Sequence, residues 1–219
     1  TWKPVTEEIN PPVLVASRNV HKVREIGRLL SDLPLQFLSP DDLGLKEAEE
    51  EDELEPFGSF ALNAMSKAKY FHSRSGLPTI ADDSGLCVDA LGGAPNVRTK
   101  RFAPVDWVEK YGLDEANNRW LLHALEGVPV ADRGAHYRCV IALSDDIEHA
   151  VFEGRVEGRI AQTPRGSNGF GYDPLFVLED GDETYGELPD FVKQATSHRF
   201  AAINATRPWL EERVCRPSR

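Results

Sequence analysis

Two adjacent carboxylates, Asp82 and Asp83, follow a short apolar run and are followed at once by Ser84 and Gly85. Because Asp, Ser and Gly favour turns, we expect a buried strand to end here and to present the aspartates in a cleft. Neighbouring strand residues point to opposite faces, so one aspartate could hold a divalent cation while the other acts as a base or a supporting partner. The same residues are also typical of an ordinary polar turn, so the motif alone leaves both interpretations open.

A second polar turn, from Ser17 to Asn19, follows a short buried strand expected at 12–16. It leads into an amphipathic helix with Asn19 as its N-cap, whose inner face carries Val23, Ile26, Leu29 and Leu30. A helix N-terminus offers free backbone N–H groups and a favourable dipole to a phosphate, and Lys22 in the first turn could reach the same anion. The alternative is a solvated lysine at the start of an ordinary α/β protein.

An acidic connection at 41–59 separates this region from a second helix. Its crowded carboxylates repel one another, so most must be solvated, although one near the end could turn inward as a metal ligand. The helix that begins at Ser59 has an apolar stripe formed by Phe60, Ala64, Ala68 and Phe71. Asn63 and Lys67 lie four positions apart on one face and can point into the same cleft, or can simply be solvated.

The next elements expected are a helix and a β-hairpin. The helix covers 114–125, and its inward residues are Trp120, Leu121 and Leu125. Alternating and β-branched residues then predict a hairpin with strands at 136–143 and 149–160.

A glycine-rich loop at 164–174 follows the hairpin. Its glycines would let the backbone approach a ligand closely, and its two aromatic residues, Phe170 and Tyr172, offer flat faces on which a base can stack. The alternative is a surface loop that its aromatic rings anchor to the core.

Polar side chains also gather before the last helix, which is expected to start near Phe200. Lys193 and the run Ser197-His198-Arg199 are donors for carbonyl or phosphate oxygens. They do not indicate a catalytic triad, because no nucleophile elbow accompanies them.

The composition is that of a globular protein, with 41% hydrophobic and 28% charged residues among 219. We expect an N-terminal arm at 1–11 and a single domain at 12–219. A net charge of −11 argues against a general binder of nucleic acid or anionic membranes, which needs a basic surface. The three widely spaced cysteines predict neither a disulfide framework nor a zinc site, and Cys139 is expected in the core. No apolar run is long enough to span a membrane and the opening residues do not resemble a signal peptide, so we expect reduced thiols and a cytoplasmic location.

Taken in order, these motifs resemble the inosine triphosphate pyrophosphatase family, whose members remove deaminated purine nucleotides. The resemblance extends from about residue 12 to about residue 210, and several ordered motifs are far less frequent by chance than any one of them. The matching blocks are 16–19 with Lys22 and Glu25, Phe60 with 63–64 and 67–68, 81–86, 90–95, Gly158 with Ile160, 164–166 leading to 169–174, and Lys193 with 197–199.

The resemblance implies an elongated α/β fold in which a long mixed β-sheet is flanked by helices and a deep active-site cleft lies between two lobes. It implies Mg²⁺-dependent hydrolysis of ITP, dITP or XTP, with water attacking the α-phosphorus to give the nucleoside monophosphate and pyrophosphate. Lysines and Mg²⁺ would offset the charge of the triphosphate and of the departing pyrophosphate. A homodimer is implied as well.

The resemblance also implies roles for individual residues at the phosphate end of the cleft. Glu55, Asp82 and Asp83 would lie around Mg²⁺, and Asp83 would be the general base that activates water. The residues that would contact the phosphates are Ser17, Asn19, Lys22 and Lys67, and Ser84 would be a further substrate-binding residue.

At the base end, the resemblance implies that Phe170 and Tyr172 sandwich the base, with Gly171 between them. Further nucleotide contacts would come from Asp173, Lys193, Ser197, His198 and Arg199. The last three would read the 6-oxo group of the purine. A donor such as His198 or Arg199 accepts that oxygen and is mismatched with the amino group of adenine.

Departures from the family pattern at several positions bear on these assignments. Asn96 stands after the Gly-Gly-Ala-Pro turn where a glycine is common, and Asn tolerates left-handed backbone conformations. Lys100 adds a cation to the following loop, and Leu62 replaces a glutamate that often precedes the Asn-Ala pair. The acidic connection is long, so Glu51 or Glu53 could be the metal ligand in place of Glu55.

Two other functions stay open on the sequence alone. A Maf-like pyrophosphatase would cleave pyrimidine or modified nucleotides, against which the 197–199 run argues. A nucleotide-binding protein without catalysis is disfavoured by Asp82, Asp83, Lys22 and Lys67.

Overall fold

The computed structural model describes residues 10–215 of the chain. The predicted N-terminal arm at 1–11 therefore lies outside the described residues except for its last two positions. None of the helices in the described range is long and apolar enough to cross a membrane.

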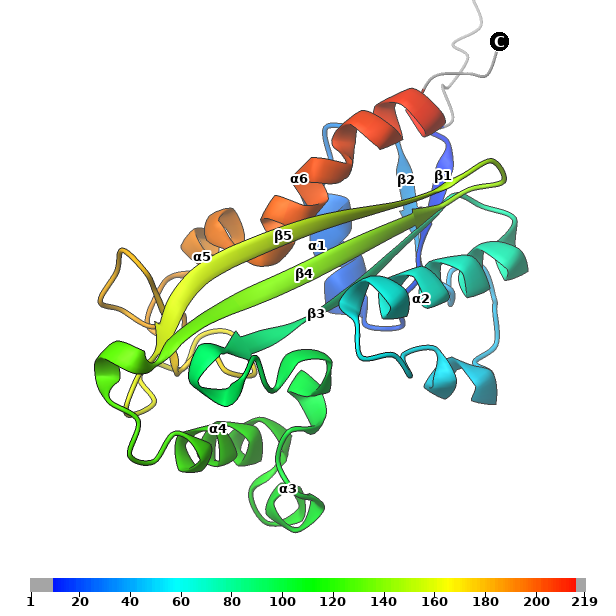
Figure 1. The fold of residues 1–219 in the computed structure, drawn as a ribbon. Helices are drawn as coiled ribbons and strands as arrows, with labels where there is room; N and C mark the ends of the chain where they lie inside the picture. The colour runs from blue at the N-terminus through cyan, green and yellow to red at the C-terminus, as the bar shows by residue number, and fades with distance from the viewer. Residues whose placement is uncertain (1–9, 216–219) are drawn as a thin grey trace, which may run out of the picture.

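A mixed six-stranded sheet, in the order β2-β1-β3-β4-β5-β6, forms the centre of the molecule. The strands are β1 Pro12–Val15, β2 Gln36–Leu38, β3 Thr79–Val88, β4 Gly134–Ser144, β5 His149–Ile160 and β6 Phe176–Leu178. β1 is parallel to both of its neighbours, whereas β3, β4, β5 and β6 pair antiparallel in succession. The long strands β3, β4 and β5 connect the two ends of an elongated molecule (Figure 1). This mixed sheet with flanking helices confirms the predicted fold class.

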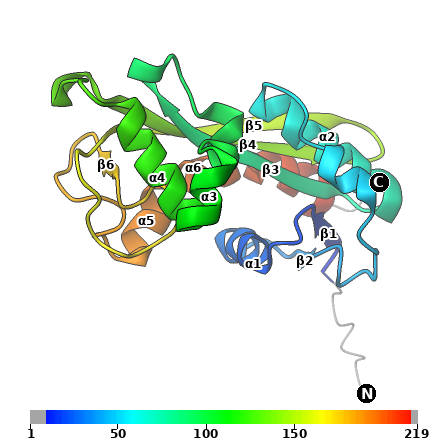
Figure 2. The ribbon, with the colours of Figure 1, turned by 90° about the horizontal axis from the view of Figure 1, so that it is seen from below.

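Helices cover both faces of the sheet (Figures 1 and 2). The α-helices are α1 Val20–Leu29, α2 Phe60–Ser75, α3 Val105–Tyr111, α4 Leu113–Ala124, α5 Asp190–Thr196 and α6 His198–Leu210. Shorter turns are the 3₁₀ segments Glu49–Glu53, Asp89–Leu91, Asn96–Arg101 and Val130–Asp132 and the π-helical turn Glu211–Cys215. α1 and α6 pack on one face, and α2 packs on the other.

Strand alternation separates the two layers of the core. In β1, Val13 and Val15 face α1 and α6, while Leu14 and the following Ala16 face α2. Successive strand side chains point to opposite faces, so an uninterrupted apolar strand supplies both layers. Cys139 of β4 is fully buried in the first layer, as predicted.

A third apolar cluster lies at the other end of β3 and β4. It joins the strands to α4 and to the segment around β6 through Leu86, Tyr137, Leu121, Leu125, Phe176 and Tyr185. Trp120 was expected to point inward with its neighbours but is only half-buried. Its ring and that of Trp107 in α3 form an edge-to-face pair, with 5.2 Å between the ring centroids. Trp120 therefore packs against α3, whereas the apolar spacing within its own helix had assigned it to the core.

The prediction that a strand ends at Asp82 and Asp83 is wrong. β3 continues through both aspartates and through Ser84 and Gly85 to Val88, because β4 pairs with it along this whole length. The ladder satisfies the backbone of residues that favour turns in isolation. Gly85 is required for close packing, since an added Cβ would lie 2.5 Å from the carbonyl oxygen of Asn96.

Other local predictions are confirmed or corrected by small amounts. The hairpin forms, α2 follows Ser59, and Asn96 has a left-handed φ of 53°. The Asn19 side chain accepts a hydrogen bond from the Lys22 amide at 3.4 Å, as an N-cap does. α6 begins at His198, before the expected Phe200, because the Ser197 hydroxyl caps it by accepting from the Phe200 amide at 3.1 Å.

The contact between β5 and the first turn of α6 depends on Gly154. An added Cβ there would lie 2.1 Å from the carbonyl oxygen of His198 and 2.3 Å from the amide nitrogen of Ala202. Both are backbone atoms, so rotation of a side chain cannot relieve the clash. Gly154 therefore sets how closely the start of α6 approaches the sheet.

We expect Gly154→Ala to lower the free energy of unfolding by about 1–3 kcal/mol, the usual range for overpacking, because α6 must move away from β5. Urea unfolding measures the loss. Gly181→Ala is the matched control, since its added Cβ would lie 3.6 Å from Leu178 Cβ, an ordinary van der Waals contact. Equal effects of the two substitutions would contradict this account.

Candidate active site

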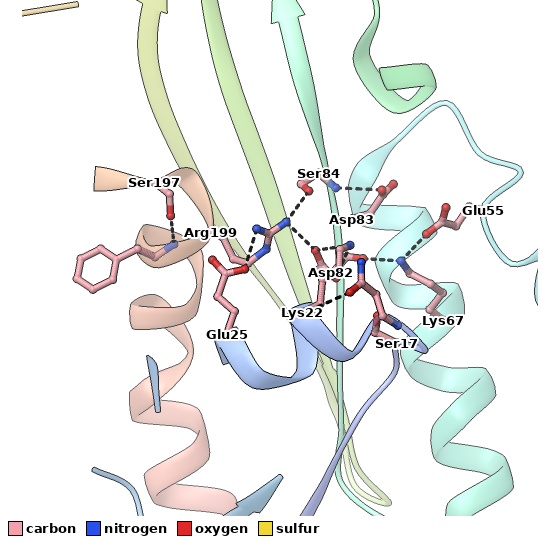
Figure 3. A network of polar contacts seen from close by, with 12 residues as sticks. Ser17, Lys22, Glu25, Glu55, Lys67, Asp82, Asp83, Ser84, Ser197 and Arg199 are labelled. Carbon is pink, nitrogen blue, oxygen red and sulfur yellow. Dashed lines mark hydrogen bonds and ion pairs between the residues drawn. The ribbon is translucent and has the colours of Figure 1, made fainter. Parts of the chain in front are cut away.

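Asp82 and Asp83 lie on opposite faces of β3, and each has its own set of partners (Figure 3). Asp82 is 2% exposed and turns toward α1 and α6. Its carboxylate oxygens lie 2.9 and 3.0 Å from the Lys22 ammonium and 3.4 Å from the Arg199 guanidinium. Asp82 therefore joins β3 to the starts of two helices through buried ion pairs.

The cations around Asp82 control its protonation. Burial alone would raise the pKa of the Asp82 carboxyl, but Lys22, Arg199 and Lys67 lower it far below its usual range. In turn, burial lowers the pKa of Lys22, and the neighbouring cations Lys67, Arg199 and Lys100 add to this effect while Asp82 opposes it. One buried carboxylate is thus surrounded by several cations, which makes this end of the site attractive to a further anion.

Asp83 points to the α2 side, where Asn63 donates to its carboxylate at 2.9 Å. The other Asp83 oxygen accepts from the Ser84 amide at 3.0 Å. Burial raises the pKa of Asp83, and the negative charges of Glu55 and Asp82 act in the same direction, while Asn63 and Lys67 oppose them. Of the two neighbours, Asp83 is the carboxylate that can accept a proton more readily.

Lys67 extends from the same face of α2 as Asn63, and the two side chains contact two carboxylates that line the cavity, Glu55 and Asp83. Its ammonium donates to the Glu55 carboxylate and to the backbone carbonyl of Asp82. Burial alone would lower the pKa of Lys67, but Asp82, Glu55 and Asp83 raise it. Lys67 is thus held as a cation between the carboxylates on the α2 side.

The three carboxylates predicted to bind Mg²⁺ do not form one ligand set. Among the side chains that the structure describes, no three of His, Cys, Asp or Glu are grouped closely enough to hold a metal ion. Asp82 is turned away by strand alternation, whereas Glu55 and Asp83 both line the same cavity. Their oxygens are the hard donors that Mg²⁺ prefers, and a cation beside them would offset the negative charge that raises the pKa of Asp83. These two residues fit the ion.

Glu51 turns inward, but as an anchor for the acidic connection. Its two oxygens each lie 2.7 Å from the Arg18 guanidinium, which also contacts Asp41 at 2.5 Å and donates to the carbonyl of Leu45 at 3.2 Å. Arg18 therefore ties this connection to the turn before α1. Glu51, the alternative to Glu55 as metal ligand, is occupied by this pair, and Glu55 is the glutamate of the acidic connection that lines the cavity.

The polar turn before α1 is shaped by its own side chains. The Ser17 hydroxyl accepts from the Asn19 amide at 3.2 Å. Ser17 and Asn19, both predicted phosphate contacts, do not line the cavity, whereas Lys22 does. Their position beside Lys22 at the start of α1 is compatible with the predicted anion site.

The glycine-rich loop is fixed by charged side chains at the opposite end of the site. Asp173, 2% exposed, accepts from the Phe170 amide at 2.8 Å and forms an ion pair with Lys193. The Lys193 ammonium also lies over the Phe170 ring, 4.4 Å from its centroid. Phe170 is 66% exposed, whereas Tyr172 is buried and donates from its hydroxyl to the carbonyl of Thr99 at 2.7 Å.

Two side chains of α4, one turn apart, bind the two backbone polar groups of one residue of this loop, Gly171. Asp114 accepts from the Gly171 amide at 2.9 Å, and Asn118 donates to the Gly171 carbonyl at 2.9 Å. This clamp places the loop relative to α4. Sequence reasoning missed both residues, although their spacing of four positions puts them on one helix face.

The run 197–199 starts α6 at the junction of the two ends. Arg199 is 6% exposed and reaches Glu25 at 3.1 Å and the Ser84 hydroxyl at 3.3 Å, besides Asp82. Glu25 belonged to the first matching motif but had no predicted role. His198 is 8% exposed and also lines the cavity.

These elements enclose one cavity of about 900 Å³. At the charged end its lining includes Lys22, Glu55, Asp83, Ser84 and Lys100. At the other end are Phe170, Gly171, Tyr172, Asp173, Lys193 and the 197–199 run. Most of the predicted site residues therefore converge, and Lys67 and Asp82 contact the charged end from behind.

The chain is similar to known proteins in both sequence and structure. The Ham1 family pattern matches residues 13–209. A "dITP/XTP pyrophosphatase" of Burkholderia pseudomallei is 43% identical over 196 residues, which cover 88% of this chain and 90% of that protein. A protein of Geobacter sulfurreducens with the same name is 43% identical over 193 residues, which cover 87% of this chain and 92% of the relative.

Solved structures agree with these relatives. A HAM1 protein from Coxiella burnetii has a TM-score of 0.81 and 36% identity, covering 92% of this chain and 99% of that one. A structure described as a nucleoside-triphosphatase and dITP/XTP pyrophosphatase from Mycobacterium abscessus has a TM-score of 0.73 and 41% identity, covering 90% and 99%.

The depressed pKa of Asp82 predicts an acid-labile fold. Its ordinary pKa of 3.8 applies in the unfolded chain, so its contribution to stability is present above about pH 3.8 and is lost as pH falls further. In the wild type, Asp82 makes the free energy of unfolding decrease as pH falls below about 3.8, with a slope that approaches about 1.4 kcal/mol per pH unit. Asp82→Asn should remove this slope, and should also cost about 3–5 kcal/mol at neutral pH by leaving Lys22 and Arg199 buried without their partner.

Urea unfolding at several pH values between about 5 and 3 measures both effects. Asp180→Asn, the same substitution in an exposed turn, is the control and should change neither. An unchanged acid slope in Asp82→Asn would show that other carboxylates cause the acid lability.

Proposed function

The chain belongs to the Ham1 family, and we propose that it hydrolyses deaminated purine nucleoside triphosphates, namely ITP, dITP and XTP, to the monophosphate and pyrophosphate. Relatives of more than 40% identity that bear the name dITP/XTP pyrophosphatase support this activity. The reaction clears damaged purine nucleotides from the triphosphate pool.

The observation that carries the proposal is the division of one cavity into two chemical ends. Lys22 and Lys100, with Asp83 and Glu55, line a strongly charged end suited to a triphosphate and its counter-ion. At the opposite end, Phe170 and other aromatic and imidazole side chains line the cavity and suit a flat base. A volume of about 900 Å³ is at the upper end of the usual range for small-molecule sites.

The proposed chemistry is an in-line attack of water on the α-phosphorus. Asp83 takes a proton from the water as its oxygen bonds to phosphorus, and the bond between the α-phosphorus and the bridging oxygen of pyrophosphate breaks. Lys22 and Lys67 offset the charge that builds up on the phosphates and on the departing pyrophosphate. Asn63, which donates to Asp83, holds the base in place.

We propose Mg²⁺ as the cofactor. Glu55 and Asp83 would hold it, and Asp82 would support them from the opposite face of β3. A bound Mg²⁺ offsets phosphate charge and polarises the phosphoryl oxygens. Lys67 keeps the Glu55 side chain directed to this side of the cavity.

Base selection is assigned to the start of α6 and to the glycine-rich loop. Phe170 and Tyr172 would flank the base, and Asp173 and Lys193 would contact the nucleotide. Ser197, His198 and Arg199 would favour an oxygen at purine position 6, because an amino group there leaves a donor unpaired.

We further propose a homodimer in the cytoplasm. The dimer rests on the family resemblance. The location is supported by the three cysteines Cys87, Cys139 and Cys215, which are free thiols.

Turnover of a nucleotide panel tests the proposed activity. ITP, dITP, XTP, GTP, ATP, CTP and UTP are incubated with Mg²⁺, and anion exchange separates pyrophosphate from phosphate. We expect kcat/KM for ITP to exceed that for ATP and for the pyrimidines by at least about 100-fold. Preference for a pyrimidine would favour a Maf-like pyrophosphatase, and release of phosphate would exclude the proposed bond cleavage.

Asp83→Asn tests the general base. We expect kcat for ITP to fall by about 10²–10⁴-fold, because the amide cannot take the proton, while the affinity for ITP measured by calorimetry changes little. Asp180→Asn serves again as the control. Full activity of Asp83→Asn would contradict the assignment, and loss of ITP binding would show that Asp83 chiefly holds the nucleotide or its Mg²⁺ instead.

A further inference from the structure

Tyr137 forms part of the cavity floor and has no role in the function described so far. It comes from β4, is 8% exposed and lines the cavity. Its ring is nearly parallel to that of His198, with an angle of 10° between the planes and 4.8 Å between the centroids. An aromatic residue of the sheet thus lies flat against the imidazole.

The Tyr137 ring is itself fixed from below. Phe176 contacts it at 4.7 Å between centroids and an angle of 57°, and Tyr185 lies 6.3 Å away at 25°. All three belong to the apolar cluster that joins β3, β4, α4 and β6. His198 therefore rests on a platform that cannot tilt without disturbing a packed core.

The two ring nitrogens of His198 have different surroundings. Nδ1 is buried and has no hydrogen-bond partner in the part of the chain that the structure describes. Nε2 is not buried in this way, and His198 lines the cavity. Burial lowers the pKa of His198 well below its ordinary value, and the cations Arg199, Lys193 and Lys22 act in the same direction while Asp82 opposes them. A neutral imidazole carries one N–H, on one of these two nitrogens.

The sealed position of Nδ1 selects between the two tautomers. A proton on Nδ1 would be a buried N–H donor without an acceptor, which is more costly than an unpaired lone pair. A proton on Nε2 is free to meet an acceptor in the cavity. The favoured tautomer is therefore a donor toward the ligand, which suits a 6-oxo group and is mismatched with a 6-amino group.

We propose that Tyr137 is a positioning residue for base selection: by stacking on His198 it keeps Nδ1 sealed and presents Nε2–H to the 6-oxo group of the purine. This rests on the proposed function for the identity of the ligand. Loss of the Tyr137 ring would let the imidazole tilt, would expose Nδ1 to water and would remove the preference for one tautomer.

Three variants of the full chain test the role of the ring. Tyr137→Leu removes the stacked ring, and Tyr137→Phe keeps it without the hydroxyl. Phe71→Leu is the control, because Phe71 is a buried ring of the core layer on the α2 side, outside the cluster that holds Tyr137, and it does not line the cavity. Tyr137→Leu should lower the ratio of kcat/KM for ITP to that for ATP by about tenfold or more. Tyr137→Phe and Phe71→Leu should keep the ratio within about twofold, although Phe71→Leu loses stability.

A spectroscopic measurement makes the test independent of turnover. In ¹⁵N-histidine-labelled protein, the His198 signals, assigned by their absence in His198→Gln, should show the Nε2–H tautomer in the wild type and a tautomer mixture in Tyr137→Leu. A wild-type Nδ1–H tautomer would overturn the proposal. An unchanged ratio in Tyr137→Leu, or an equal fall in Phe71→Leu, would also overturn it. Absence of ITP turnover in the wild type would refute the proposed function, while the tautomer would still decide the role of Tyr137.

Discussion

The buried carboxylate of Asp82 is the charge on which the arrangement of the site depends. It lies on a central strand and binds cations from α1 and α6, while the carbonyl of the same residue accepts from Lys67 of α2. Three helices from distant parts of the sequence are thereby directed to one point. A buried ion of this kind is stable only with its partners, so folding and the assembly of the charged end of the cavity are one process.

The alternation of side chains along β3 gives the two adjacent aspartates different tasks. Asp82 is surrounded by cations and stays ionised, whereas burial and the negative neighbours raise the pKa of Asp83 on the other face. The two aspartates are adjacent in sequence, but they lie on opposite faces of the sheet and their pKa values are shifted in opposite directions. That separation is what acid–base chemistry at a paired carboxylate requires.

Much of this site follows from sequence patterns that reflect local geometry. The spacing of Asn63 and Lys67 places both on one helix face, and the apolar stripe beside them fixes which face is buried. The end of β3 could not be read locally, because pairing with β4 overrides the turn preference of the residues after Asp82. Glu51 was one of several similar carboxylates, and only the position of Arg18 in space distinguishes it. Tyr137 has the sequence signature of an ordinary core residue, and its contact with His198 links segments that are 61 positions apart.

The clamp of Asp114 and Asn118 on the Gly171 peptide has a consequence for the thermodynamics of binding. A loop with so many glycines has a large conformational entropy when free, and ordering a residue costs about 1–2 kcal/mol. Here the amide N–H and the carbonyl of Gly171, the residue between the two aromatic residues, are both already bonded to a helix. The loss of chain entropy at this peptide therefore occurs during folding, so that a ligand meets a preorganised surface and more of its contact energy is expressed as affinity.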